Sequence, residues 1–291
     1  MAEDTVIEKV GIGAKLKDYA ILTKMRLAVL VVVSAIATYI LAGGAMGIDF
    51  LYLILGGFLI TGSSNTFNQI IERDIDAKMD RTKHRPLAAG RMGVAEAAVV
   101  GSVFGILGAL LLFNINFLSG VLGVLALVMY VFLYTPLKRI SSWAVFVGAF
   151  PGAIPPMLGV VAATNEFGLL AGLMFLVQFV WQFPHFWAIA WIKDDDYRKG
   201  GFSLLPSKSR KSKASALQIV FYSLLLIPAS LLPWAFNICN DLTLIVGTVA
   251  GMWFFLLSYK LYLNLDDKSA KRLMFASFIY LPIIQFIYVF S

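Results

Sequence analysis

Four oxygen-bearing side chains recur at four-residue spacing in one segment of the chain: Asn68, Glu72, Asp76 and Asp80. Each four-residue step along an α-helix drifts by only about 40° around the axis, so Asn68, Glu72 and Asp76 are expected to share one helix face. Mg²⁺ is typically held by a few carboxylates together with the phosphates of a substrate. The spacing therefore predicts a magnesium site for a phosphate-bearing molecule, and the alternative is a solvated helix end at a membrane interface.

Basic residues cluster near these acids and recur in two later segments. The candidates for contacting a diphosphate are Arg81, Lys83, Arg85, Lys138, Arg139 and Lys193. Arginine binds phosphate oxygens through two parallel hydrogen bonds, and lysine acts as a point charge. We predict that these side chains neutralise a diphosphate. The alternative for any one of them is a role in membrane topology or in contacts with lipid headgroups.

A second acidic cluster, Asp194 to Asp196, follows an apolar segment at its polar end. Helix C-termini disfavour carboxylates, and three in a row repel one another, so a basic side chain or a metal ion must compensate for them. Two acidic clusters that face one cavity would suit two Mg²⁺ ions around a diphosphate. The alternative is a solvated acidic turn.

One histidine lies inside an apolar segment, in the run WQFPHFWAIAW that begins at Trp181. Gln182 precedes His185 by about one helical turn. A buried histidine can be a haem ligand or a general base, but a lone one is more often a hydrogen-bonded core residue, which is the interpretation that spacing alone favours. The tryptophans of this run are either interface anchors or walls for a flat aromatic substrate.

The elements that must position these side chains are membrane-spanning helices. The chain has 291 residues, of which 59% are hydrophobic and 14% charged, against about 25% charged in ordinary soluble domains. Nine apolar segments are long enough to span a bilayer: 27–46, 50–71, 94–113, 117–136, 141–162, 168–191, 215–235, 242–262 and 272–290. Because open sheets cannot satisfy their backbone groups in lipid, we predict an all-α polytopic membrane protein that forms a single domain over residues 1–291.

The distribution of charge predicts the orientation of this bundle. Lysine and arginine occur in residues 1–24 and in the loops after the even-numbered segments, whereas the other loops carry none. This positive-inside pattern places residues 1–24 in the cytoplasm and the C-terminus outside. The acids in residues 1–24 argue against a mitochondrial presequence, which favours a bacterial inner membrane. Topology accounts for much of the net charge of +7, so no nucleic-acid partner is needed.

The fifth apolar segment is unusually rich in proline and glycine. Gly148 and Gly152 have the four-residue spacing that lets helices approach closely. Pro151, Pro155 and Pro156 are expected to kink the span or to interrupt its hydrogen bonds. The alternative to plain helix packing here is the wall of a cavity.

Several motifs resemble those of the intramembrane aromatic prenyltransferases of the UbiA type, and within them the branch that farnesylates haem. The matching stretches are RDIDAKMDRTKHRPL from Arg73, YTPLKR from Tyr134, GAFPGAIPP from Gly148 and WQFPHF from Trp181. The resemblance covers nearly the whole chain. Two departures bear on the metal site, because Glu72 stands where the superfamily usually has aspartate, and Ile192 stands where quinone-pathway relatives have an acid.

The resemblance implies a reaction and a set of ligands. Asn68, Glu72 and Asp76 would hold Mg²⁺, with help from Asp195 or Asp196, and the metal would bind farnesyl diphosphate. The farnesyl cation would then be attacked by a vinyl group of haem b. A further group, Trp181, Gln182 and His185, would contact the haem. The expected partners are the two substrates, the lipid bilayer and other haem-handling enzymes.

Two alternative functions remain open from the residues. A sibling enzyme would prenylate a quinone precursor such as 4-hydroxybenzoate, and it would need the same acidic cluster. A transporter would carry charges near the bilayer midplane and a trail of polar residues to the outer face. The outer halves of the apolar segments are almost purely apolar, which argues against transport.

Overall fold

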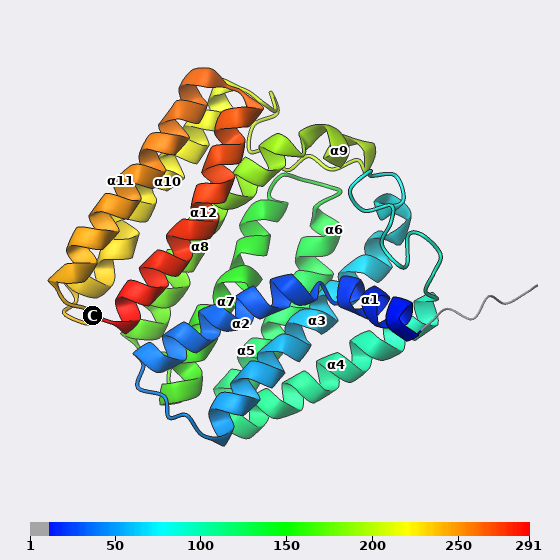
Figure 1. Ribbon diagram of the computed structural model, residues 1–291, viewed down its shortest axis with the longest axis horizontal. Helices are drawn as coiled ribbons and strands as arrows, with labels where there is room; N and C mark the ends of the chain where they lie inside the picture. Colours follow the sequence, from blue (N-terminus) through cyan, green and yellow to red (C-terminus); the bar gives the residue numbers. More distant parts are fainter. Residues whose placement is uncertain (1–11) are drawn as a thin grey trace, which may run out of the picture.

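The computed structural model describes residues 12–291, and within them every regular element is a helix (Figure 1). The helices are α1 (Ile12–Leu22), α2 (Met25–Leu41), α3 (Ile48–Asp76), α4 (Val94–Ile115), α5 (Phe117–Val128), η1 (Met129–Tyr134), α6 (Thr135–Leu137), α7 (Ala144–Thr164), α8 (Leu169–Ile192), α9 (Asp194–Lys199), α10 (Lys213–Ala235), α11 (Asp241–Asn264) and α12 (Asp267–Val289). The expected all-α bundle is thereby confirmed. The charges expected in the first part of the N-terminal segment lie outside the described residues.

The number of membrane spans agrees with the prediction. Within residues 12–291, eight helices are long and apolar enough to cross a membrane, and α1 with α2, which meet at 50°, makes a ninth. Some boundaries differ from the predicted ones. Helix α3 continues to Asp76, beyond the expected end at residue 71, so Glu72 and Asp76 lie on the helix itself and Asp80 follows it. Helix α12 begins earlier than expected because the Asp266 side chain accepts a hydrogen bond from the backbone N–H of Ser269 at 2.7 Å and caps its first turn.

The fourth predicted span is not a uniform α-helix. Its last part is the π-helix η1, which leads directly into the single turn α6. A π-helical turn contains an extra residue, so it changes which residues after it face the bundle interior. Such turns are frequent at functional sites. Here η1 precedes Thr135 and Lys138, both of which are buried.

The prolines of α7 do not interrupt it, because the helix runs unbroken from Ala144 to Thr164. Small residues instead let α7 approach its neighbours. A Cβ atom added to Gly152 would overlap the side-chain oxygen of Gln182 on α8, and one added to Gly159 would overlap the backbone of Ala35 on α2. The expected close helix packing is confirmed, the prolines do not end the helix, and a kink at them stays a prediction.

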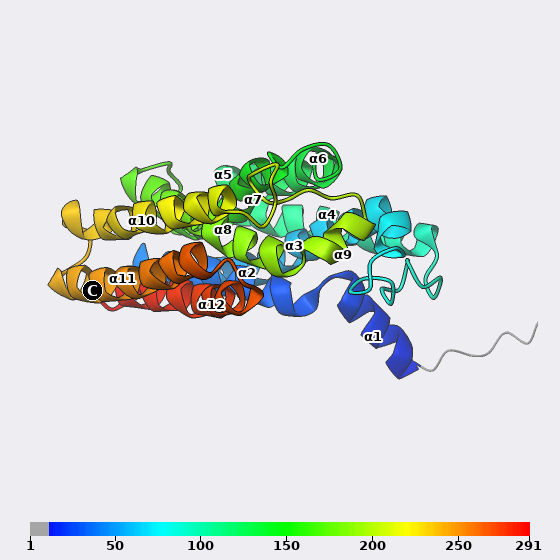
Figure 2. The same cartoon turned by 90° about the horizontal axis from the view of Figure 1, so that it is seen from above.

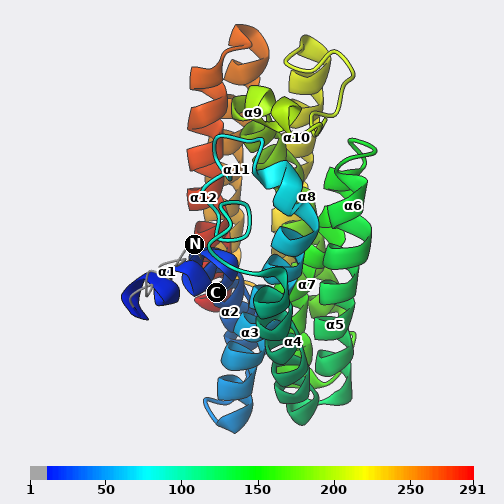
Figure 3. The same cartoon turned by 90° about the vertical axis from the view of Figure 1, so that its right-hand side faces the viewer.

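The long helices form two groups that meet where α7 contacts α8 and where α2 contacts α12. One group is α8, α10, α11 and α12, and the other contains α2, α3, α4, α5 and α7. Figure 2 shows α10, α8 and α7 in one layer, with α11, α12 and α2 in the layer facing it. In Figure 3, α12 lies on one flank and α6 on the other, with α3 and α8 between them.

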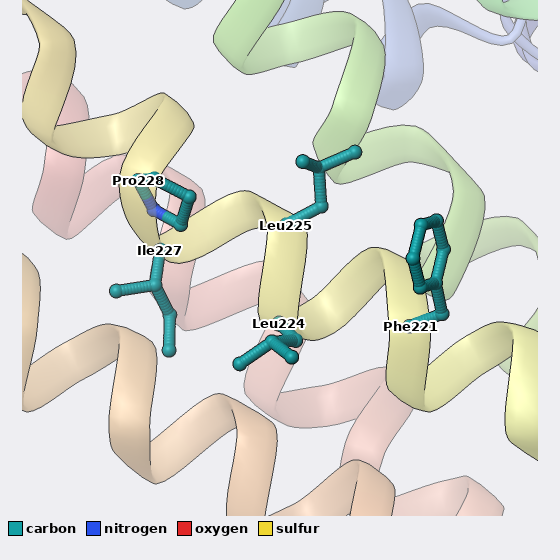
Figure 4. Close-up of a pocket in the computed structure, with 5 residues that line it drawn as sticks. All are labelled: Phe221, Leu224, Leu225, Ile227 and Pro228. Carbon is teal, nitrogen blue, oxygen red and sulfur yellow. The ribbon is translucent and has the colours of Figure 1, made fainter.

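The polar connections gather at one end of the bundle. Helix α9, the 77–93 connection and α1 lie at this end, and the C-terminus lies at the other (Figure 1). The outer faces of the helices are apolar. A shallow groove of about 300 Å³ on α10, lined by Phe221, Leu224, Leu225, Ile227 and Pro228 (Figure 4), carries no ionisable side chain. Such a surface suits lipid rather than chemistry.

Replacing Gly159 with alanine is expected to destabilise the fold by about 1–3 kcal/mol, because the added methyl group meets backbone rather than a movable side chain. Gly172→Ala on α8 is the matched control, since no atom lies within 4 Å of its added Cβ. The control is expected to be neutral or to gain up to about 1 kcal/mol from helix propensity. Thermal unfolding in detergent measures both. Equal melting temperatures for the two variants would contradict the close contact between α2 and α7.

Candidate active site

The three spaced residues of α3 lie inside the bundle. The exposed fractions of Asn68, Glu72 and Asp76 are 1%, 3% and 1%. They lie on one face of the last two turns of α3, as their spacing predicts. Buried carboxylates are costly unless they are paired or bind a metal, so their partners define the site.

Each buried carboxylate has a basic partner from another part of the chain. Lys138 Nζ lies 2.5 Å from Glu72 Oε1, and Arg85 donates a hydrogen bond from a terminal guanidinium nitrogen to Asp76 Oδ2 at 2.7 Å. The side chains of Lys138 and Arg85 are only 10% and 13% exposed. These two cations are the ones that the structure brings to the acidic cluster among the six predicted from the sequence.

A third basic residue, Lys24, was missed by the sequence analysis. It lies in the short break between α1 and α2, and its Nζ donates a hydrogen bond to Asn68 Oδ1 at 3.3 Å. The amide nitrogen of Asn68 donates to Thr135 Oγ1 at 3.2 Å, and Thr135 donates to the carbonyl oxygen of Tyr130 at 2.8 Å. The bend after α1 and the π-helix η1 therefore both position groups around Asn68.

The balance of charge in this cluster suits a ligand that is itself anionic and accompanied by metal. Three basic side chains, Lys24, Arg85 and Lys138, face two carboxylates. Asp76 Oδ1 is buried and accepts no hydrogen bond, which leaves a hard oxygen donor for a cation. Within residues 12–291, no three acidic, histidine or cysteine side chains are close enough to hold a metal by themselves. Substrate phosphates or Asn68 would complete the ligand set, as Mg²⁺ usually requires.

The second acidic cluster divides into residues with different partners. Asp194 is buried and forms an ion pair with Arg210. Asp195 lies 3.4 Å from the same guanidinium group, and its side chain is 83% exposed. A basic side chain therefore does compensate for this cluster, but it is Arg210 and not Lys193, which is exposed. The structure does not bring Asp195 to the α3 cluster, and its role as a metal ligand stays a prediction.

Asp196 links two connections at this end of the bundle. Its carboxylate accepts hydrogen bonds from the backbone N–H groups of Asp80 at 2.8 Å and Arg81 at 3.4 Å. Lys199 of α9 pairs with the Asp80 side chain. Hydrogen bonds from Lys199 and from Lys83 lower the pKa of Asp80 to about 2. In this arrangement Asp196 binds the backbone of the 77–93 connection, and its role as a metal ligand stays a prediction.

The segment after α9 covers the acidic cluster from the same end. A Cβ atom on Gly200 would lie 2.9 Å from the Ile75 side chain and 3.0 Å from Met79 Sδ, so the end of α9 packs directly against the end of α3. Phe202 is buried, and its ring centre lies 5.5 Å from Lys138 Nζ. The connection after α8 therefore closes over the lysine that pairs with Glu72.

The remaining predicted basic residues lie at the surface. Arg81 stacks over the Tyr197 ring at 5.6 Å, and Lys83 pairs with Asp80 at 2.8 Å. Arg139 and Lys193 are exposed, and neither has an ion-pair partner in the described part of the chain. A role for these four in binding a diphosphate stays a prediction.

The predicted haem-contact residues lie together on α8. His185 Nδ1 is 2.6 Å from Ser277 Oγ on α12, and the His185 ring stacks on Trp181 with centres 4.4 Å apart. The Trp181 indole N–H donates to the carbonyl oxygen of Ser277 at 3.1 Å, and Gln182 donates to the carbonyl oxygen of Ala149 on α7 at 2.9 Å. All three are buried between α7 and α12. The hydrogen bond of His185 agrees with the core-residue alternative, and haem contact stays a prediction.

Comparison with known protein families gives a match over most of the chain. The model of the UbiA prenyltransferase family matches residues 30–281. The chain is 46% identical over 281 residues to a protein of Flavobacterium psychrophilum named protoheme IX farnesyltransferase, covering 94% of this chain and 93% of that protein. A protein of Christiangramia forsetii with the same name is 46% identical over 284 residues, with coverage of 94% and 93%.

Solved structures share the fold at lower sequence identity. A digeranylgeranylglyceryl phosphate synthase superposes with a TM-score of 0.79 at 19% identity, covering 95% of this chain and 98% of that one. A UbiA homologue of Archaeoglobus fulgidus bound to GPP and Mg²⁺ gives a TM-score of 0.65 at 14% identity, covering 94% and 100%. The arrangement of helices is therefore one already known from membrane proteins.

Proposed function

Because the chain belongs to the UbiA prenyltransferase family, we propose that it transfers a farnesyl group from farnesyl diphosphate to a vinyl group of haem b, which gives haem O. The observation that carries the proposal is the buried cluster of two carboxylates and three basic side chains with an unpartnered Asp76 oxygen. The names and 46% identity of the two relatives support farnesyl and haem as donor and acceptor.

The α3 cluster would bind the diphosphate. Asn68, Glu72 and Asp76 would hold Mg²⁺, with Asp195 or Asp196 joining if they leave their present partners. Bound Mg²⁺ would neutralise charge that develops on the departing diphosphate. The ion pairs with Lys138 and Arg85 compensate the two carboxylates, and a diphosphate that takes over Lys138 and Arg85 would free these carboxylates for the metal.

The basic residues would hold the leaving group after the allylic C–O bond breaks. Lys24, Arg85 and Lys138 surround the cluster from three separate segments. Fixed charges aimed at developing charge are the main means by which such sites accelerate a reaction. The exposed Arg81, Lys83, Arg139 and Lys193 would attract the anion to this end of the bundle.

The bundle interior would accept the haem and shield the farnesyl cation from bulk water. Trp181, Gln182 and His185 would line the haem site. The protein would act as a single domain in a bacterial inner membrane, with its N-terminus in the cytoplasm and its C-terminus outside, and it would pass its product to other haem-handling enzymes. The positions of the polar connections and of the C-terminus at opposite ends of the bundle support this orientation (Figure 1).

A single assay tests the proposal. The purified protein is incubated with haem b, farnesyl diphosphate and Mg²⁺, and the haems are separated by chromatography. The expected result is a haem that elutes much later because of its added apolar chain, and that fails to form when EDTA replaces Mg²⁺. Unchanged haem would contradict the proposal, and formation of prenylated 4-hydroxybenzoate in a parallel reaction would assign the protein to the quinone branch.

A further inference from the structure

Helix α8 carries a stripe of polar side chains through an otherwise apolar span. Gln178, Gln182 and His185 are spaced by four and three residues, so they share one face of the helix. All three are buried, with exposed fractions of 9%, 2% and 7%. Polar groups inside a membrane protein are costly and usually have a function. Contact with haem does not by itself explain why the His185 ring is hydrogen-bonded at one nitrogen and fixed in one orientation.

The hydrogen bonds around Ser277 fix the protonation of the His185 ring. Ser277 Oγ donates its only hydrogen to the carbonyl oxygen of Met274 at 2.6 Å. Ser277 Oγ is equally close to His185 Nδ1, and a carbonyl oxygen cannot donate, so both contacts are hydrogen bonds only if His185 Nδ1 donates to Ser277. A neutral ring with its hydrogen on Nδ1 has an unprotonated Nε2. Within residues 12–291, no other group hydrogen-bonds to this ring, so the lone pair of Nε2 is free.

The ring is also held in one orientation. It stacks on Trp181 at an angle of 15°, and Trp181 is itself tied to the backbone of Ser277. The Phe278 ring meets the imidazole edge-on at 5.0 Å. An imidazole with one nitrogen anchored, the other free and its plane fixed has the arrangement of a general base.

His185 lies at a suitable depth for the reaction. It precedes the end of α8 by seven residues, and Asn68 precedes the end of α3 by eight. At about 1.5 Å of rise per residue, these correspond to roughly 10 and 12 Å from the helix ends. Both helices end on the same side of the bundle (Figure 1). Counted from these ends, His185 and Asn68 therefore lie a similar number of helical turns inside the bundle.

Electron counting shows that the proposed reaction needs such a base. When the terminal carbon of the haem vinyl group forms a bond to C1 of the farnesyl cation, the vinyl π electrons are used and the inner carbon becomes a cation. This cation either loses a proton from the neighbouring carbon to the departing diphosphate, which gives a diene, or adds water, which gives an alcohol. Water addition forms a C–O bond and releases one proton, and an apolar interior offers few acceptors for it.

We propose that His185 is a catalytic general base whose Nε2 takes the proton from the water that adds to this inner carbon. Ser277 is a positioning residue, because it acts only by keeping the hydrogen on Nδ1. The step balances, since water supplies the oxygen, the cation accepts its electron pair and His185 accepts the proton. The inference rests on the proposed function and adds to it the residue that decides between an alcohol and a diene.

His185→Asn tests the assignment, because the asparagine amide can still donate to Ser277 but has no basic nitrogen. Formation of the alcohol is expected to fall about 10²- to 10⁴-fold, the usual contribution of a general base. Mass spectrometry is expected to reveal a farnesylated haem lighter by one water molecule. The ratio of this product to the alcohol is the decisive measurement, because it does not depend on how tightly haem b binds.

Ser277→Ala provides a second test with a milder change. It removes the acceptor for Nδ1–H, so kcat for the alcohol is expected to fall while KM for both substrates stays the same. Ser223→Ala is the matched control, because Ser223 is equally buried and donates within its own helix to the carbonyl oxygen of Ile219 at 2.8 Å. The control is expected to behave as the unchanged protein.

The outcomes separate this inference from the proposed function. If the unchanged protein does not farnesylate haem b, the proposed function fails. If it does, and His185→Asn forms the same alcohol at the same rate, the general base is wrong. A changed iron spectrum of bound haem in His185→Asn, with no product lighter by one water molecule, would also overturn it, because His185 would then be an iron ligand. Equal kcat values for Ser277→Ala and Ser223→Ala would overturn the role of Ser277.

Discussion

Asp76→Asn and Glu72→Gln are each expected to lower turnover by about 10²- to 10³-fold or more, because each removes one of the two buried negative charges available to Mg²⁺. Both changes preserve the size of the side chain. Asp76 is the more telling, since one of its oxygens pairs with Arg85 and the other accepts no hydrogen bond. An amide in its place supplies one neutral oxygen, so the metal and its diphosphate lose a charge-based contact.

The test is haem farnesylation by each purified variant over a range of Mg²⁺ concentrations. Asp74→Asn is the matched control, because Asp74 lies two residues away on α3 and its side chain is 86% exposed. The control is expected to keep full activity. All variants are first compared by size-exclusion chromatography in detergent, since a loss of activity is informative only in folded protein. Full activity in both Asp76→Asn and Glu72→Gln would remove the metal site from α3.

Lys138→Met is expected to destabilise the protein by about 3–5 kcal/mol, because it leaves the buried Glu72 carboxylate without its cation. Turnover is expected to fall as well, since Lys138 is one of the cations that would hold the leaving diphosphate. The two effects can be separated. In the double variant with Glu72→Gln no unpaired charge remains, so stability is expected to return while activity stays lost.

Arg139→Met is the control for this experiment. Arg139 follows Lys138 directly, but it is exposed, so its removal is expected to change stability by less than about 0.5 kcal/mol. Thermal unfolding and the farnesylation assay are applied to all three variants. An unchanged melting temperature for Lys138→Met would contradict the buried pair, and a double variant as unstable as Lys138→Met would assign the effect to packing instead.

The helical bundle and the shared face of Asn68, Glu72 and Asp76 on α3 could be predicted from the sequence, because both follow from the spacing of residue types. Apolar runs of about 20 residues need lipid, and residues four apart on one helix must share a face. The burial of Asn68, Glu72 and Asp76 therefore agrees with their spacing. The basic partners Lys138 and Arg85 were also among the candidates, because they lie in connections at the same end of the bundle.

The remaining features depend on contacts between distant segments. Lys24 reaches Asn68 because α1 and α2 meet at a bend, and no spacing within the N-terminal segment indicates such a bend. The π-helix η1 has the same apolar composition as an α-helix would have. Asp196 binds backbone N–H groups of the 77–93 connection. Because nearly every residue type has a backbone N–H group, the sequence does not show which one a side chain will bind.

The prolines of α7 do not end the helix, although proline inside a helix usually kinks or breaks it. Three prolines inside the helix cost backbone hydrogen bonds, yet the helix continues through all of them. Tight contacts at Gly152 and Gly159 hold α7 against α8 and α2. Tertiary packing therefore outweighs the local preference, which is common in membrane helices because their neighbours can accommodate the freed groups.

The contact between α9 and the 77–93 connection is expected to depend on ionic strength, whereas the buried ion pair of the α3 cluster is not. The Lys199–Asp80 pair is about half exposed, with side-chain fractions of 51% and 61%, so dissolved salt screens it. The Lys138–Glu72 pair beneath Phe202 is 10% and 4% exposed and is screened far less. Rising salt therefore weakens the contact between α9 and the 77–93 connection before it affects the buried pair. In the proposed function, salt would then change how fast diphosphate enters at this end more than how tightly it binds.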